Sequence, residues 1–99
     1  MKPAAFAPSA RAEFEAAAEW YESHASGLGD EFVACVDEMV GRIGTSPREF
    51  PTWAGDRRFR RAVAQSFPYV IFFRELPDGV EVVAIAHAAR QPGYWLRRK

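Results

Sequence analysis

Two apolar runs in the last third of the chain, separated by a four-residue turn, constrain the fold more than any other feature. Residues 67–73 are Phe-Pro-Tyr-Val-Ile-Phe-Phe, and residues 80–87 are again almost wholly apolar. Between them lies Leu76-Pro77-Asp78-Gly79, in which proline suits the first turn position and glycine tolerates a positive φ. Because so short a turn joins them, the strands predicted over Tyr69–Glu75 and Val80–His87 are antiparallel.

A first helix is predicted over Ala10–His24. Apolar residues recur there at spacings of four, three and four, at Ala10, Phe14, Ala17 and Tyr21, which is the period of an amphipathic helix. The residue before it, Ser9, is the expected N-cap, since its hydroxyl accepts an otherwise unpaired backbone N–H.

A second helix follows the break at residues 26–29. Its apolar stripe runs from Phe32 to Ile43, Asp30 and Glu31 lie near its start, and Gly44 ends it. Two consecutive helices joined by about four residues form an antiparallel hairpin. This hairpin is the element available to cover the apolar strand at residues 70–73.

The remaining segments complete an α+β fold. A short edge strand is expected over Ala4–Ala7 and another strand over Arg57–Ala64, whereas the Pro- and Gly-containing residues 45–56 are expected to form a loop with Phe50 and Trp53 against the core. The predicted order is β-α-α-β-β-β, with a helix hairpin packed on a small antiparallel sheet.

The composition fits one soluble domain spanning residues 1–99, with 48% hydrophobic and 26% charged residues. The single cysteine, Cys35, excludes an internal disulfide and a multi-cysteine zinc site, and we expect it to fill apolar space. No run approaches the roughly 18 apolar residues of a membrane-spanning helix, and the start lacks a signal-like segment. We therefore expect a cytoplasmic protein without a metal, a cofactor or a membrane partner.

The net charge of zero hides a segregation along the chain. Residues 1–56 contain four basic and ten acidic residues, and residues 57–99 contain nine basic and three acidic residues. This asymmetry indicates a basic face that attracts a polyanion or an acidic peptide. The equally weighted alternative is an acidic helical layer that complements a basic sheet layer inside the fold.

Specific residues add to this pattern. The most distinctive are Phe67-Pro68-Tyr69 and an ending that contains His87, Arg90, Pro92, Tyr94 and Trp95; the others are Trp20-Tyr21-Glu22, Gly27-Leu28-Gly29, Phe32, Pro47 and Phe59-Arg60-Arg61. With the predicted element order, they resemble the RelE/ParE superfamily of type II toxin–antitoxin toxins, and its ParE-like branch in particular. The resemblance covers nearly the whole chain, from about residue 6 to residue 95.

The resemblance implies a bacterial growth-inhibiting toxin that is held inactive by a cognate antitoxin protein, whose disordered C-terminal segment wraps the toxin. ParE-like members poison DNA gyrase, whereas RelE-like members cut mRNA in the ribosome. The ParE-like features favour gyrase as the target. On that hypothesis the chain is not itself an enzyme.

Ribosome-dependent mRNA cleavage is the alternative function. Attack by a 2′-hydroxyl requires a proton acceptor, a donor to the leaving oxygen and cations around the phosphate. The candidates for these roles are His87 as base or acid, Arg61 and Arg90 as phosphate clamps, and Tyr94 for base stacking or proton donation.

Two features argue against a nuclease. The only lysines are Lys2 and Lys99, whereas RelE-like nucleases resemble one another in a lysine-rich surface. The residue after His87 is Ala88, so the His-Tyr pair of some nuclease relatives is absent. The missing lysines also leave open a third hypothesis, a non-toxic interaction module on the same fold.

The residues expected to contact the target or the antitoxin come from the basic strand and the C-terminal end: Arg58, Arg60, Arg61, Arg90, Tyr94, Trp95, Arg97 and Arg98. For the antitoxin we expect the groove between the helix hairpin and the sheet, with the basic strand edge facing its acidic residues.

Plainer roles remain open for the same residues. The arginines of residues 57–61 also suit a solvated strand edge that discourages aggregation, and His87 also suits a hydrogen-bonded structural histidine. The side chain of Trp95 either packs back on the sheet or projects toward the target. We expect Trp20, Tyr21 and Trp53 to pack in the core or against a helix, because aromatic side chains bury large areas.

Overall fold

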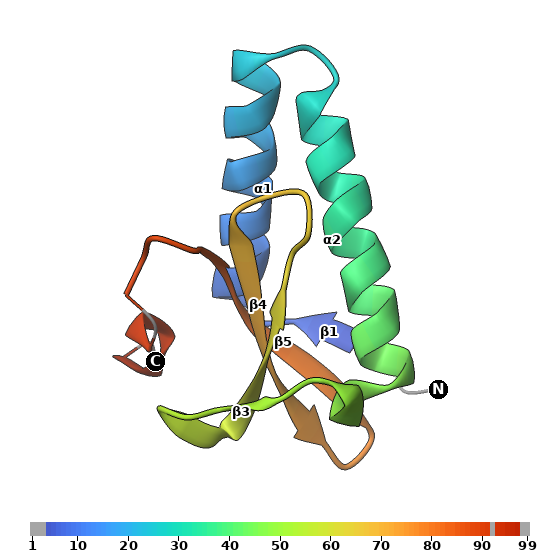
Figure 1. The fold of residues 1–99 in the computed structure, drawn as a ribbon, viewed down its shortest axis with the longest axis vertical. Helices are drawn as coiled ribbons and strands as arrows, with labels where there is room; N and C mark the ends of the chain where they lie inside the picture. Colours follow the sequence, from blue (N-terminus) through green and yellow to red (C-terminus); the bar gives the residue numbers. More distant parts are fainter. Residues whose placement is uncertain (1–3, 92, 98–99) are drawn as a thin grey trace.

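The computed structural model, which describes residues 4–91 and 93–97, contains two helices beside a five-stranded sheet (Figure 1). The elements in chain order are β1 (Ala4–Phe6), α1 (Pro8–His24), α2 (Leu28–Thr45), the 3-10 helix η1 (Pro47–Glu49), β2 (Thr52–Trp53), β3 (Asp56–Val63), β4 (Tyr69–Leu76), β5 (Gly79–His87) and the 3-10 helix η2 (Tyr94–Arg97). The α+β prediction is confirmed, with the short β2 added inside the predicted loop. Neither helix of the described ranges is long and apolar enough to cross a membrane.

The sheet has the strand order β1-β5-β4-β3-β2. The pairs β5–β4, β4–β3 and β3–β2 are antiparallel, as their short connections require. β1 instead pairs parallel with β5, with Ala4 opposite Val80 and Phe6 opposite Val82. The sheet is therefore mixed, not wholly antiparallel as predicted. A parallel neighbour becomes available because the whole helix hairpin and three strands separate β1 from β5.

α1 begins two residues earlier than predicted. Ala7, not Ser9, is the N-cap residue, no side chain caps this end, and Pro8 occupies the first turn. Proline has no N–H to satisfy and its φ is already helical, so it favours a start at this position. The N-cap role predicted for Ser9 is wrong, because Ser9 lies inside the helix.

α2 begins inside the segment predicted to break the helices. Gly27 there has a φ of 86°, in the left-handed region. The carboxylate of Glu22, from α1, accepts the backbone N–H groups of Gly27 at 3.0 Å and of Gly29 at 3.0 Å. A side chain of one helix thus satisfies the free N–H groups at the start of the other.

The helices approach each other closely at Gly29. A Cβ atom at this position would lie 2.7 Å from the carbonyl oxygen of Ala18. Only a residue without a side chain fits here without displacing backbone.

The inner face of the sheet packs against both helices. Phe32 of α2 is fully buried, with ring centroids 5.2 Å from Tyr21 and 5.1 Å from Tyr69. The buried members of this inner core are Ala10, Ala17, Tyr21, Phe32, Val36, Met39, Ile43, Ala62, Ile71, Phe73, Val80, Val82 and Ile85. The helix hairpin covers the apolar centre of β4 as predicted.

The outer face of the sheet has a second, smaller core. Its buried members are Phe59, Phe72, Ala84, Ala86 and Trp95, with Trp53 and Tyr94 packed against them. Trp95 comes from η2, so the C-terminal segment folds back over the face that the helices leave uncovered. In Figure 1 this red segment lies at the left of the view, beside the sheet.

The three aromatic residues expected in the core have different places. Tyr21 is buried in the inner core and Trp53 packs on the outer core, but the side chain of Trp20 is 55% exposed. Trp20 stacks on His24 of the next turn, with ring centroids 3.8 Å apart. A place in the core is wrong for Trp20, because the helical rotation that turns Tyr21 inward turns its neighbour outward.

Candidate functional site

The C-terminal segment leaves β5 through a tight, hydrogen-bonded turn. The N–H of Arg90 donates to the carbonyl of His87 at 2.9 Å, and the N–H of Ala89 donates to Nδ1 of the same histidine at 3.0 Å. Gly93 then has a φ of 94°, which an L side chain rarely adopts. These features reverse the chain and direct η2 onto the outer face of the sheet.

Trp95 anchors this segment. Its side chain is 5% exposed, and its ring centroid lies 4.1 Å from that of Phe72, 5.2 Å from Trp53 and 6.0 Å from Phe59. Trp95 therefore packs back on the sheet and does not project away from it. A direct contact of Trp95 with a partner stays a prediction, which this burial disfavours.

Two glycines make room for the aromatic stack on this face. A Cβ atom on Gly55 would lie 2.3 Å from the ring of Trp53, and one on Gly93 would lie 3.0 Å from the same ring. Trp53 therefore occupies space that side chains at both positions would fill. The outer core depends on glycine at these points of close approach.

Glu13 of α1 is the hub of a polar cluster beside this core. Its Oε1 accepts the backbone N–H of Ile85 at 3.1 Å, and its Oε2 accepts a hydrogen bond from the hydroxyl of Tyr94 and lies 3.4 Å from a guanidinium nitrogen of Arg90. The Arg90 guanidinium also lies over the Tyr94 ring, 3.4 Å from its centroid. Two of the predicted binding residues are thus held together by a residue of the helix layer.

No role for Glu13 was predicted from the sequence. Position 13 lies three residues after Ala10 and four before Ala17, so it falls at the margin of the buried stripe of α1. A carboxylate at that spacing was the available indication that this glutamate faces the sheet.

The basic strand β3 has two kinds of arginine. Arg58 pairs with Asp56 at 2.6 Å, and Arg60 donates to the carbonyl of Phe50 at 2.7 Å and lies 3.3 Å from the carboxylate of Glu75. Hydrogen bonding to Arg58 lowers the pKa of the Asp56 carboxyl. These two arginines are already engaged within the fold.

Arg57 and Arg61 differ from them. Both are exposed, and no ion pair to either is found within residues 4–91 and 93–97. Side chains alternate along a strand, and the neighbouring Ala62 is buried in the inner core, so Arg61 points to the outer face. Arg61 therefore has its charge available to a partner.

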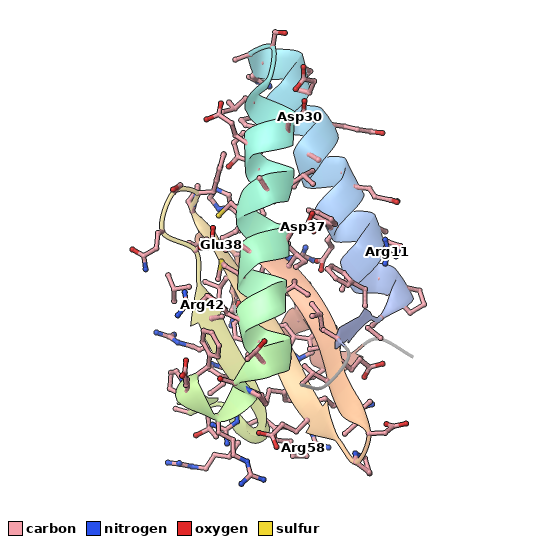
Figure 2. All side chains as sticks on the ribbon, turned by 90° about the vertical axis from the view of Figure 1, so that its right-hand side faces the viewer. Arg11, Asp30, Asp37, Glu38, Arg42 and Arg58 are labelled. Carbon is pink, nitrogen blue, oxygen red and sulfur yellow. The ribbon has the colours of Figure 1, made fainter. Side chains whose placement is uncertain are left out.

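The segregated charges are only weakly paired with one another. Among the ion pairs of the described residues, Arg90–Glu13 alone connects α1 or α2 to the basic second half of the chain. Figure 2 shows Asp30, Asp37 and Glu38 along α2 and Arg58 at the far end of the sheet. This arrangement favours separate acidic and basic surfaces over internal complementarity.

The four residues proposed for RNA cleavage do not form one constellation in the structure. His87 on β5 lies opposite Tyr69 of β4, and Arg61 on β3 lies opposite Phe72 of β4. His87 and Arg61 are therefore two strands apart across the sheet and three residues apart along it. Each of these separations is on the order of 10 Å. Tyr94 and Arg90 are tied to Glu13, and no group of metal-binding side chains occurs within the described ranges.

A groove of about 400 Å³ lies between α2 and the end of β3. It is lined by Glu31, Ala34, Cys35, Glu38, Met39, Arg42, Val63, Gln65, Ser66 and Phe67. The backbone N–H of Arg61 donates to the carbonyl oxygen of Pro51 at 3.1 Å. Between Arg61 and the end of β3 at Val63, no strand in the described part of the chain pairs with this edge. Val63 there is 52% exposed, so the groove offers apolar surface beside an open strand edge.

Residues 4–92 match the family described as the ParE toxin of the type II toxin–antitoxin system, parDE. Among solved structures, the chromosomal ParDE toxin–antitoxin system from P. aeruginosa is similar, with a TM-score of 0.65 at 13% identity over 88% of this chain and 96% of that chain. At this identity the likeness concerns the fold. No curated protein sequence matches the chain.

Proposed function

The chain belongs to the ParE toxin family of type II toxin–antitoxin systems, and on that premise we propose that it inhibits DNA gyrase until an antitoxin neutralises it. The family match over residues 4–92 is the observation that carries the proposal. A toxin–antitoxin system implies a cognate antitoxin as partner. Because gyrase acts on the chromosome, the proposed site of action is the cytoplasm.

The positions of the would-be catalytic groups support a binding protein over a nuclease. The Tyr94 hydroxyl and the Arg90 guanidinium are engaged by Glu13, and Nδ1 of His87 accepts a backbone N–H. General acid–base cleavage needs such groups within hydrogen-bond reach of a single phosphate. The observed contacts give these side chains structural partners instead.

The proposed target surface combines the exposed arginine of β3 with the folded C-terminal segment. Arg61 is exposed on the outer face, and the side chain of Arg90 is 54% exposed although it pairs with Glu13. Arg97 and Arg98 continue this basic segment, and Arg98 lies outside the described residues. A surface of this charge suits an acidic patch of a protein partner.

The proposed antitoxin site is the groove between α2 and β3. Met39, Val63 and Phe67 supply apolar surface, and the open edge of β3 can accept hydrogen bonds from an added strand. The neighbouring Arg61 would face acidic residues of the antitoxin. This site lies at the β3 side of the sheet, whereas Glu13 itself contacts β5, on the other side of β4.

Purified toxin added to gyrase in a supercoiling reaction tests the proposal. We expect loss of supercoiling and accumulation of broken DNA, with Arg61→Ala weakening the effect and His87→Ala leaving it unchanged. Cleavage of ribosome-bound mRNA that disappears in His87→Ala would instead establish the nuclease. A chain that affects neither reaction would be an interaction module on this fold.

A further inference from the structure

The carboxylate of Glu13 joins three groups that are distant in sequence. It accepts the backbone N–H of Ile85 in β5 and the hydroxyl of Tyr94 in η2, and it pairs with Arg90 between them. These partners follow Glu13 by 72, 81 and 77 residues. One side chain of α1 therefore fixes the C-terminal segment to both the helix layer and the sheet.

The cluster is shielded at its centre and open at its rim. The Glu13 side chain is 15% exposed, whereas that of Arg90 is 54% exposed. The guanidinium of Arg90 lies over the Tyr94 ring, at 3.4 Å from the ring centroid. A shielded carboxylate makes stronger charge-assisted hydrogen bonds than one in bulk water, so it can hold an exposed arginine in one place.

We infer that Glu13 is a positioning residue that sets the placement of Arg90 and Tyr94 for contact with the target. This inference rests on the proposed function, because it assumes that the basic C-terminal segment contacts gyrase. Tyr94 directly precedes the buried Trp95, so the Glu13 hydrogen bond and the aromatic anchor fix adjacent residues. Because the hydrogen bond and the anchor already order the segment, less conformational entropy is lost when it binds.

The variant Glu13→Gln tests this role with little change in shape. Its amide oxygen can still accept the N–H of Ile85, but the charge that holds Arg90 is gone. Glu15→Gln is the matched control, since Glu15 is exposed on the same helix and the substitution removes the same charge. We expect Glu13→Gln to need roughly tenfold more toxin for half-inhibition of gyrase, as for loss of a hydrogen bond to a charged group. Glu15→Gln should match the wild type.

Hydrogen exchange of the backbone amides at residues 93–96 separates positioning from general instability. In Glu13→Gln these amides should exchange faster, while those of α2 and β4 keep their protection. The Tyr94→Phe variant, which removes only the hydroxyl, should also accelerate exchange at residues 93–96. It replaces Glu13→Gln as the test if Glu13→Gln does not fold.

Two results would overturn the inference. Unchanged exchange at residues 93–96 in both variants would show that Glu13 does not hold the segment. Gyrase inhibition by Glu13→Gln equal to or stronger than that of the wild type would show that fixing the segment does not help binding. If the wild-type chain does not inhibit gyrase at all, the proposed function fails, whereas the exchange measurement still decides whether Glu13 fixes the segment.

Discussion

The two faces of the sheet are covered in different ways. On the inner face, helices of 17 and 18 residues bury an almost wholly apolar core around Phe32, Ile43 and Phe73. On the outer face, a four-residue 3-10 helix buries Trp95 and is fixed by the Glu13 carboxylate. The difference indicates that the inner face provides most of the stability, and that the outer face displays a basic segment which can detach at lower cost.

The largest expected effect is on the inner face. Phe32→Ala removes a fully buried ring that contacts Tyr21, Tyr69 and Phe67. We expect the free energy of unfolding to fall by about 3–5 kcal/mol, which is much of the stability of a small domain. Urea denaturation followed by circular dichroism measures it. A loss below about 1 kcal/mol would contradict the assignment of stability to this face.

Trp95→Ala should cost less, about 2 kcal/mol, although the ring removed is larger. η2 can unfold locally and leave the helices and the inner core intact, so the cavity need not persist. The same denaturation experiment gives the free energy. Global destabilisation equal to that of Phe32→Ala would show that the two cores form one cooperative unit.

Two glycines of α2 form a matched pair. Gly29→Ala places a Cβ atom 2.7 Å from a backbone oxygen of α1, whereas Gly41 has open space around it. We expect Gly29→Ala to destabilise by about 1–3 kcal/mol and Gly41→Ala to stabilise by up to about 1 kcal/mol. Thermal unfolding of both proteins measures the contrast. Stabilisation by both substitutions would mean that the helices do not approach closely at residue 29.

Glu22 has the role in the helix hairpin that Glu13 has in the C-terminal segment, since each carboxylate connects two elements. Glu22→Ala leaves the N–H groups of Gly27 and Gly29 without their acceptor and should cost about 1 kcal/mol. Glu19→Ala, on the same exposed helix surface, serves as the control in the same unfolding measurement. Equal destabilisation by the two substitutions would show that Glu22 does not cap the start of α2.

The smallest effect is expected at alkaline pH. Burial raises the pKa of Tyr69, with smaller contributions from the charges of Tyr21 and Glu13, and burial also raises the pKa of Tyr21 above the usual 10.0. A raised pKa contributes stability that is fully present below pH 10 and is lost as the pH rises through the folded-state pKa. An absorbance titration should show that Tyr69→Phe removes one late-titrating phenol. Titration of all tyrosines together near pH 10 would contradict this.

Local patterns in the sequence predicted much of the fold. The turn at residues 76–79 indicated the β4–β5 hairpin, and the spacing of apolar residues indicated both helices, because these elements depend on contacts between near neighbours. The parallel pairing of β1 with β5 and the outer core around Trp95 depend on residues far apart in the chain. Periodicity carries no information about such contacts.

The candidate site was harder to predict for the same reason. The basic residues of β3 and the C-terminal end were identified, but their composition could not separate Arg58 and Arg60, which form ion pairs with Asp56 and Glu75, from Arg61, for which no ion pair is found within the described residues. Glu13 acts across 81 residues of sequence, so only the three-dimensional structure reveals its contact with Tyr94.

Inducible expression of the chain in a bacterial host, with chromosome breaks and mRNA cleavage assayed in the same cultures, tests the central claim most directly. The gyrase proposal predicts DNA breaks and a DNA-damage response while messages stay intact, and relief of both when the antitoxin is co-expressed. Rapid cleavage of mRNA in cells whose chromosomes remain whole would contradict it.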